Sequence, residues 1–309
     1  MNEAKSTAFS TKSTLWAAAL VFWGAILFST KAVFVKLAYR YEVDSTSLLA
    51  LRMLFSLPFF LLIGWWNQRK NPTRTALTRR DWGSIALLGF AGYYLASLLD
   101  FLGLQYIGAG MERLILFVYP TLVLLISALV YKQPVLPKQF MALVLTYIGI
   151  TVAFAQGAKR SGEAHFWLGA VLIFGSALAY AIYLIGSGRL LPRLGTLRYT
   201  SLAMTFAAIS ILVHHGILYH WDLLGFAPQV YQLSLVMAIL ATVLPSFLIS
   251  EGIRIIGSSN ASIIGSVGPI STIILAYVFL NEQFGVYQWV GTLLVIGGVL
   301  MISLQKGKG

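Results

Sequence analysis

Long apolar stretches recur along the whole chain, and they constrain its fold more than any other feature. Of its 309 residues, 58% are hydrophobic and only 10% are charged. A soluble domain carries about 25% charged residues, so this chain has too few polar side chains to cover a water-exposed surface. A helix of about 20 mostly apolar residues crosses a bilayer. Ten segments meet this length: 14–38, 45–66, 82–104, 108–130, 137–156, 165–187, 197–217, 231–256, 259–280 and 284–304.

These segments must be helices, because every backbone polar group inside hydrocarbon has to be paired within the protein. The sequence therefore predicts an all-α integral membrane protein of ten transmembrane helices, for which the lipid bilayer is the solvent. Residues 1–13 are polar and carry no cleavage site, so we expect the first helix to be an uncleaved anchor. The tail 305–309 is the other polar end.

Lys and Arg placement predicts the orientation, because cytoplasmic loops carry the excess of these residues. With the N-terminus inside, the four outer positions are Lys36, Arg40, Lys159 and Arg160. The fifteen inner positions are Lys5, Lys12, Arg69, Lys70, Arg74, Arg79, Arg80, Lys132, Lys138, Arg189, Arg193, Arg198, Arg254, Lys306 and Lys308. We therefore expect both termini in the cytoplasm and the chain in the plasma membrane, which is the inner membrane of a Gram-negative cell. The net charge of +12 then reflects loop anchors and not nucleic-acid binding.

The second half of the chain repeats the first at a shift of 149 residues. The matched pairs include Gly103 and Gly252, Gly108 and Gly257, Pro120 and Pro269, Gln139 and Gln288, and Gly149 and Gly298. Each half holds five predicted helices, and an odd number gives the second half the opposite orientation in the membrane. The sequence thus predicts two inverted five-helix repeats, 14–156 and 165–304, around a central cavity. Inverted repeats are the architecture of many secondary transporters.

Two motifs carry a family resemblance. The first runs from Gly108 to Tyr119-Pro120, and the second runs from Gly257 to Gly268-Pro269 and on to Asn281-Glu282. The chain resembles the drug/metabolite transporter superfamily, specifically the EamA type. In that family a glutamate usually follows the proline by thirteen residues; Glu282 keeps it and Gln133 replaces it. The resemblance implies a transporter similar to exporters of amino acids, other small metabolites and drugs.

Charged residues inside a membrane are costly and usually face the interior of a helix bundle. Arg52 lies near the middle of the second span, and we expect it to pair with Asp100 or Glu112. It either binds or gates an anion, or it belongs to a buried ion pair that holds the helices together. Lys31 and Arg113 also fall within spans, and Arg113 is expected to form a pair of its own.

The remaining candidate residues lie on helix faces that carry several polar groups. Spacings of three, four and seven residues place side chains on one helix face. The candidates that line the predicted cavity are Trp23, Arg52, Tyr93, Ser97, Asp100, Glu112, Tyr119, Ser176, Tyr180, Tyr183 and Asn260. On the ninth span Asn260, Ser262 and Ser266 offer hydrogen bonds, and the alternative for these serines is close helix packing. The alternative for Glu112 is partial hydration near the end of its helix. Pro120, Pro245 and Pro269 are expected to kink their helices.

No nucleotide-binding, metalloprotease or nucleophile-elbow motif is present in the sequence. His214, His215 and His220 cluster after the seventh span, and we expect them in a solvated outer loop and not in a metal site. No cofactor and no enzymatic activity are expected.

The sequence therefore predicts a secondary active transporter of small metabolites. Its expected partners are the lipid bilayer and a small-molecule substrate, with protons as the candidate coupling ion. Asp100 or Glu112 would carry the proton if burial favours its protonated form. The alternatives are a non-transporting receptor or assembly subunit and a membrane-embedded enzyme. The sequence does not choose the substrate, the direction of transport or the oligomeric state.

Overall fold

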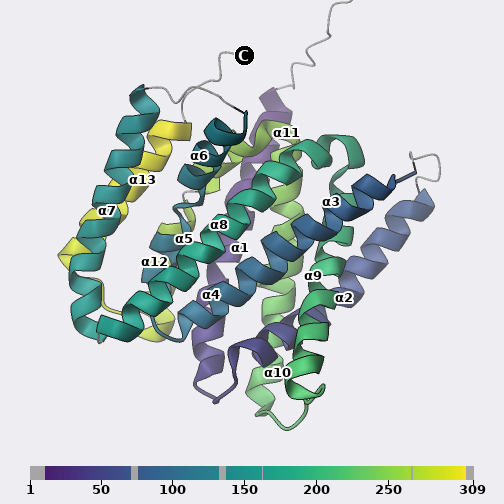
Figure 1. Cartoon of the computed structure of the whole chain (residues 1–309), viewed down its shortest axis with the longest axis horizontal. Helices are drawn as coiled ribbons and strands as arrows, with labels where there is room; N and C mark the ends of the chain where they lie inside the picture. Colours follow the sequence, from purple (N-terminus) through teal and green to yellow (C-terminus); the bar gives the residue numbers. More distant parts are fainter. Residues whose placement is uncertain (1–10, 71–75, 132–136, 162, 266, 304–309) are drawn as a thin grey trace, which may run out of the picture.

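The computed structural model describes residues 11–70, 76–131, 137–161, 163–265 and 267–303. Every regular element in these ranges is a helix (Figure 1). The first half holds α1 (Thr11–Tyr39), α2 (Ser45–Lys70), α3 (Arg79–Gly89), the π-helix η1 (Phe90–Leu95), α4 (Ala96–Leu104), α5 (Ala109–Leu116), α6 (Tyr119–Tyr131) and α7 (Pro137–Ser161). The second half holds α8 (Glu163–Leu194), α9 (Thr196–Tyr219), α10 (Pro228–Ala238), the π-helix η2 (Ile239–Val243), α11 (Leu244–Gly265), α12 (Val267–Leu280) and α13 (Val286–Ser303).

The prediction of an all-α membrane protein is confirmed. Seven helical stretches in the described residues are long and apolar enough to cross a bilayer, and three shorter apolar helices lie at 144–153, 267–280 and 286–298. Their exposed surface is rich in large hydrophobic side chains, such as Leu129, Trp167 and Leu293, as expected where lipid is the solvent. The figure of ten crossings stays a prediction. The polar ends 1–10 and 304–309, and Gln133, lie outside the described residues.

The irregularities of the backbone repeat at the same shift of 149 residues. The two π-helices begin at Phe90 and Ile239, and each interrupts an otherwise α-helical span. In the first half a helix starts after Gly108 and ends at Leu116, and a second starts at Tyr119. In the second half the backbone leaves helical geometry at Gly257, with φ 80° and ψ 161°, and α11 then runs on to Gly265. The same distortions in both halves support the two-repeat fold independently of side-chain identity.

The three prolines predicted to kink helices lie close to the starts of helical elements. Pro120 is the second residue of α6, Pro245 the second residue of α11, and Pro269 the third residue of α12. Pro120 follows the break at Phe117–Val118, and in the first turn of a helix proline loses nothing, because the backbone N–H there has no partner within the helix. Pro245 directly follows η2 within the continuous helical span Pro228–Gly257. The kinks at Pro245 and Pro269 stay predictions.

Helices of the two halves pack against each other throughout the bundle. α1 lies along α11 and α12, α2 lies along α9, and α4 lies along α8. α7 and α13 stand side by side at one edge of the bundle (Figure 1). This interleaving leaves a cavity between α1, α8, α11 and the broken spans η1–α4 and α5–α6.

Candidate functional site

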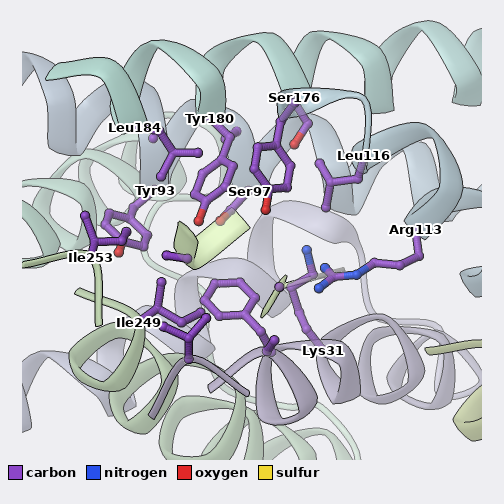
Figure 2. A pocket seen from close by; sticks show the side chains of 18 residues that line it. Lys31, Tyr93, Ser97, Arg113, Leu116, Ser176, Tyr180, Leu184, Ile249 and Ile253 are labelled. Carbon is purple, nitrogen blue, oxygen red and sulfur yellow. The ribbon is translucent and has the colours of Figure 1, made fainter. Parts of the chain in front are cut away.

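The cavity between the two halves has a volume of about 90 Å³. A single water needs about 10–15 Å³, so there is room for several waters or part of a small solute. The polar side chains of its wall are Lys31, Tyr93, Ser97, Arg113, Tyr119, Ser176 and Tyr180 (Figure 2). Five of the predicted residues thus meet around one space: Tyr93, Ser97, Tyr119, Ser176 and Tyr180.

Arg52 is buried, but its partner is not the one predicted. Its Nη2 donates to Ser97 Oγ at 3.0 Å, and its guanidinium stacks 4.8 Å from the centre of the Phe101 ring. Among the described residues it forms no ion pair with Asp100 or Glu112. The expected pairing is wrong because Lys31 of α1 forms the ion pairs with both carboxyl groups. Arg52 instead positions Ser97, whose own hydroxyl proton remains available to the cavity.

Lys31 stands at the centre of a buried charge cluster. Its Nζ lies 2.5 Å from Asp100 Oδ2 and 3.6 Å from Glu112 Oε1. The three residues are 5%, 1% and 0% exposed, respectively, so the partly hydrated alternative for Glu112 is wrong. One cation and two carboxyl groups therefore form a buried cluster, and Lys31 also contributes to the wall of the cavity.

Tyrosines close the cavity on the side of η1. Tyr183 donates from its hydroxyl to that of Tyr93 at 3.1 Å, and the two ring centres are 4.8 Å apart. Gly92 makes this contact possible, because a Cβ at that position would overlap the Tyr183 ring. One turn after Tyr183 on α8, Ser187 Oγ lies 2.7 Å from the Tyr199 hydroxyl. Tyr183 therefore belongs to this cluster behind the wall and does not itself line the cavity.

One predicted residue lies elsewhere, and one cannot be placed within the described part of the structure. Trp23 is 60% exposed on α1, beside Phe22, and does not line the cavity. Its face of α1 looks out to the lipid. The side chain of Asn260 lies outside the described part of the structure.

The expected solvated histidine loop is wrong for two of its members. His214 and His215 belong to the last turns of α9, which packs on α2 and η1. His215 Nε2 lies 3.0 Å from Ser47 Oγ, and His214 Nδ1 lies 3.0 Å from the Tyr94 hydroxyl. Only His220 follows the helix. Within the described ranges no three His, Asp or Glu side chains are arranged to hold a metal ion.

Glu282 links the two halves at the start of α5. Its Oε1 accepts from the backbone N–H of Ala109 at 2.9 Å, and its Oε2 accepts from that of Gly110 at 3.2 Å. α5 begins after Gly108, which has no side chain to cap the helix. The first N–H groups of a helix need such a partner, and here a carboxylate of the second half supplies it.

Sequence reasoning missed several wall residues. Lys31 and Arg113 were visible as charges inside spans, but nothing in the sequence showed that they face the same space. Phe28, Ile249 and Ile253 form part of the apolar wall and cannot be told by type from residues that face lipid.

Comparison with known proteins gives consistent matches. The sequence model of the EamA-like transporter family matches residues 15–155 and 167–304. The chain is 30% identical over 292 residues to the uncharacterized transporter YcbK of Bacillus subtilis, covering 92% of this chain and 93% of that one. It is 27% identical to the uncharacterized inner membrane transporter YicL of Salmonella typhimurium, covering 74% and 76%. A solved crystal structure shares the fold with a TM-score of 0.67 at 16% identity, covering 92% of this chain and 95% of its own.

Proposed function

Because the chain belongs to the EamA-like transporter family, we propose that it is a secondary active transporter that exports small metabolites by alternating access. The resemblance seen in its sequence motifs is confirmed, and with it the assignment as a multi-pass membrane transporter. Amino acids and related organic solutes are the proposed substrates. The observation that carries the proposal is a cavity between the halves with a buried charge cluster beside it.

Alternating access requires a binding space that both halves line and contacts that can break at either end. The cavity receives Ser97 and Arg113 from the first half and Ser176 and Ile249 from the second. In two-repeat transporters the halves rock against each other around such a site. The cap of Glu282 on α5 is a contact between halves that would open in this motion.

The Lys31, Asp100 and Glu112 cluster is the proposed site of a coupling proton. Two buried carboxylates beside one ammonium group repel each other. Lys31 balances one negative charge, and a proton on either carboxyl group balances the other. A loaded cluster is then neutral, whereas an empty one holds a buried negative charge, and this difference would link protonation to the conformation.

We place the protein in the plasma membrane with both termini in the cytoplasm, on the strength of the Lys and Arg distribution. The Glu282 contact would then lie toward the outside and the Asp81–Arg193 ion pair toward the inside.

The test is solute flux in proteoliposomes, screened over amino acids and small organic acids with and without a proton gradient. We expect gradient-dependent flux that Asp100→Asn reduces to background. Asp222→Asn is the matched control, because it alters an exposed carboxylate in the 220–227 loop. The proposal of transport fails if no solute moves. Proton coupling fails if an uncoupler leaves the flux unchanged.

A further inference from the structure

Arg113 lines the cavity and forms no ion pair with any side chain that the structure describes. The described residues place no carboxylate within ion-pair distance of it, and its Nε is buried without a hydrogen-bond partner. A Cβ at Gly268 would lie 2.6 Å from Arg113 Nη2, so this glycine of the other half makes room for the guanidinium. The side chain is thus extended into a shared space and is left without a counter-ion.

The two neighbouring cations, Lys31 and Arg52, already have partners within the protein. Lys31 holds the two carboxyl groups, and Arg52 is held by Ser97 and the Phe101 ring. A guanidinium taken out of water without an anion is costly. A negative group that enters the cavity would therefore be stabilised most at Arg113.

The other wall residues of the cavity indicate what kind of solute would carry this negative group. Figure 2 shows Arg113 and Lys31 at one end of the view and Leu184, Ile249 and Ile253 at the other. The Tyr180 ring stands between them. The space is thus cationic at one end and mainly apolar at the other, where Tyr93 adds one hydroxyl, and this matches a solute with one ionic end and one apolar end.

We propose that the cavity binds a small organic monocarboxylate, with its carboxylate on Arg113 and its aromatic or aliphatic body against Tyr180, Ile249 and Ile253. This inference rests on the proposed transport function and names the substrate class. The planar guanidinium matches a carboxylate with two parallel hydrogen bonds. A single uncompensated cation suits one negative charge, and a phosphate dianion would need more.

Binding is tested first, apart from transport, on the purified full-length protein. The probes share one phenyl body: 3-phenylpropanoate, its amide 3-phenylpropanamide, and the amine 3-phenylpropan-1-amine. Equilibrium dialysis should show at least about tenfold tighter binding of the carboxylate than of the amide, since a hydrogen-bonded charge pair contributes more than a neutral contact. Equal binding of the three probes, or preference for the amine, would overturn the proposal.

Variants then assign the binding to Arg113. Arg113→Gln should weaken carboxylate binding by at least about tenfold and leave amide binding unchanged. Arg113→Lys should recover part of the loss, because it restores the charge without the planar fork. Arg69→Gln is the matched control at the exposed end of α2, and melting curves identify any variant that fails to fold.

The two proposals fail in different ways. If Arg113→Gln binds the carboxylate as the parent does, the assignment to Arg113 is wrong whether or not solutes move. If flux of neutral or cationic solutes is found but no carboxylate binds, transport stands and the substrate class falls. If no solute of any charge moves in liposomes, the transport proposal itself falls.

Discussion

The carboxylate of Glu282 caps the helix that begins at Ala109, with 2.9 Å between Oε1 and the backbone nitrogen. The Phe284 ring covers the same helix start, where a Cβ at Gly110 would overlap it. The loop between α12 and α13 thereby seals the second half onto the first. A helix N-terminus favours a negative charge, so this seal combines hydrogen bonds with an electrostatic attraction.

Removing that carboxylate should loosen the seal. The chain has no cysteine, so Ser176→Cys introduces a single thiol into the cavity wall. With Glu282→Ala added, we expect a membrane-impermeant maleimide to label this thiol several-fold faster from the side on which residues 281–285 lie. Asp222→Ala, which removes an exposed carboxylate from another loop, should leave the rate as it was. Identical labelling rates in all three proteins would mean that Glu282 does not hold the cavity closed.

The buried charge cluster should behave as one unit. Lys31→Met leaves two carboxyl groups without their cation and should destabilise the protein by about 3–5 kcal/mol. Adding Asp100→Asn should recover part of that loss, which gives a coupling free energy of about 1–3 kcal/mol. Unfolding in mixed detergent, followed by helix signal, measures both values. Lys70→Met, at the exposed end of α2, is the control and should change stability by less than about 0.5 kcal/mol. Strictly additive effects of the two substitutions would contradict the pairing.

Two glycines of α3 should respond oppositely to the same change. A Cβ at Gly89 would strike the backbone carbonyl of Ala203 on α9, whereas a Cβ at Gly83 meets nothing within 4 Å. Gly89→Ala should therefore cost about 1–3 kcal/mol, because neither backbone can move freely. Gly83→Ala should stabilise the helix by up to about 1 kcal/mol. Thermal unfolding of the pair in detergent is the measurement, and a shift of the same sign in both would refute the close α3–α9 contact.

Reporter fusions at the C-terminus and in the 220–227 loop should show the orientation of the protein in the membrane. A fluorescent-protein fusion at the C-terminus should be bright, and an alkaline phosphatase fusion there should be inactive, because the C-terminus is expected inside. A phosphatase fusion within residues 220–227 should be active. The opposite pattern would reverse the orientation and move the Glu282 seal to the cytoplasmic side.

The helical class and the two-fold repeat could be predicted because the bilayer restricts the choices so strongly. Apolar length identifies helices, and Gly108 with Pro120 and Gly257 with Pro269 mark the same break twice. Part of the polar wall could also be predicted, because polar side chains such as those of Tyr93, Ser97 and Tyr180 are unfavourable against lipid and are expected to face the interior of the bundle.

Charge pairing could not be predicted, because it depends on helix rotation. Arg52, Lys31 and Arg113 are all cations inside spans, and only the packing of α1 against α4 and α5 decides that Lys31 meets Asp100. The prediction for Trp23 was wrong for a related reason. The residues of α1 around Trp23 are apolar on every side, so their periodicity does not show which face meets lipid.

The matching π-helices at Phe90–Leu95 and Ile239–Val243 have a consequence for comparing relatives. A π turn carries one residue more than an α turn, and each residue turns a helix by about 100°. A homologue whose aligned sequence lacks one residue in either window has straightened that turn. After a gap in the first window, the position equivalent to Ser97 would point about 100° away from the cavity, and after a gap in the second window the same would hold for Ile249 and Ile253. A gap outside the cavity wall would therefore indicate a rebuilt site.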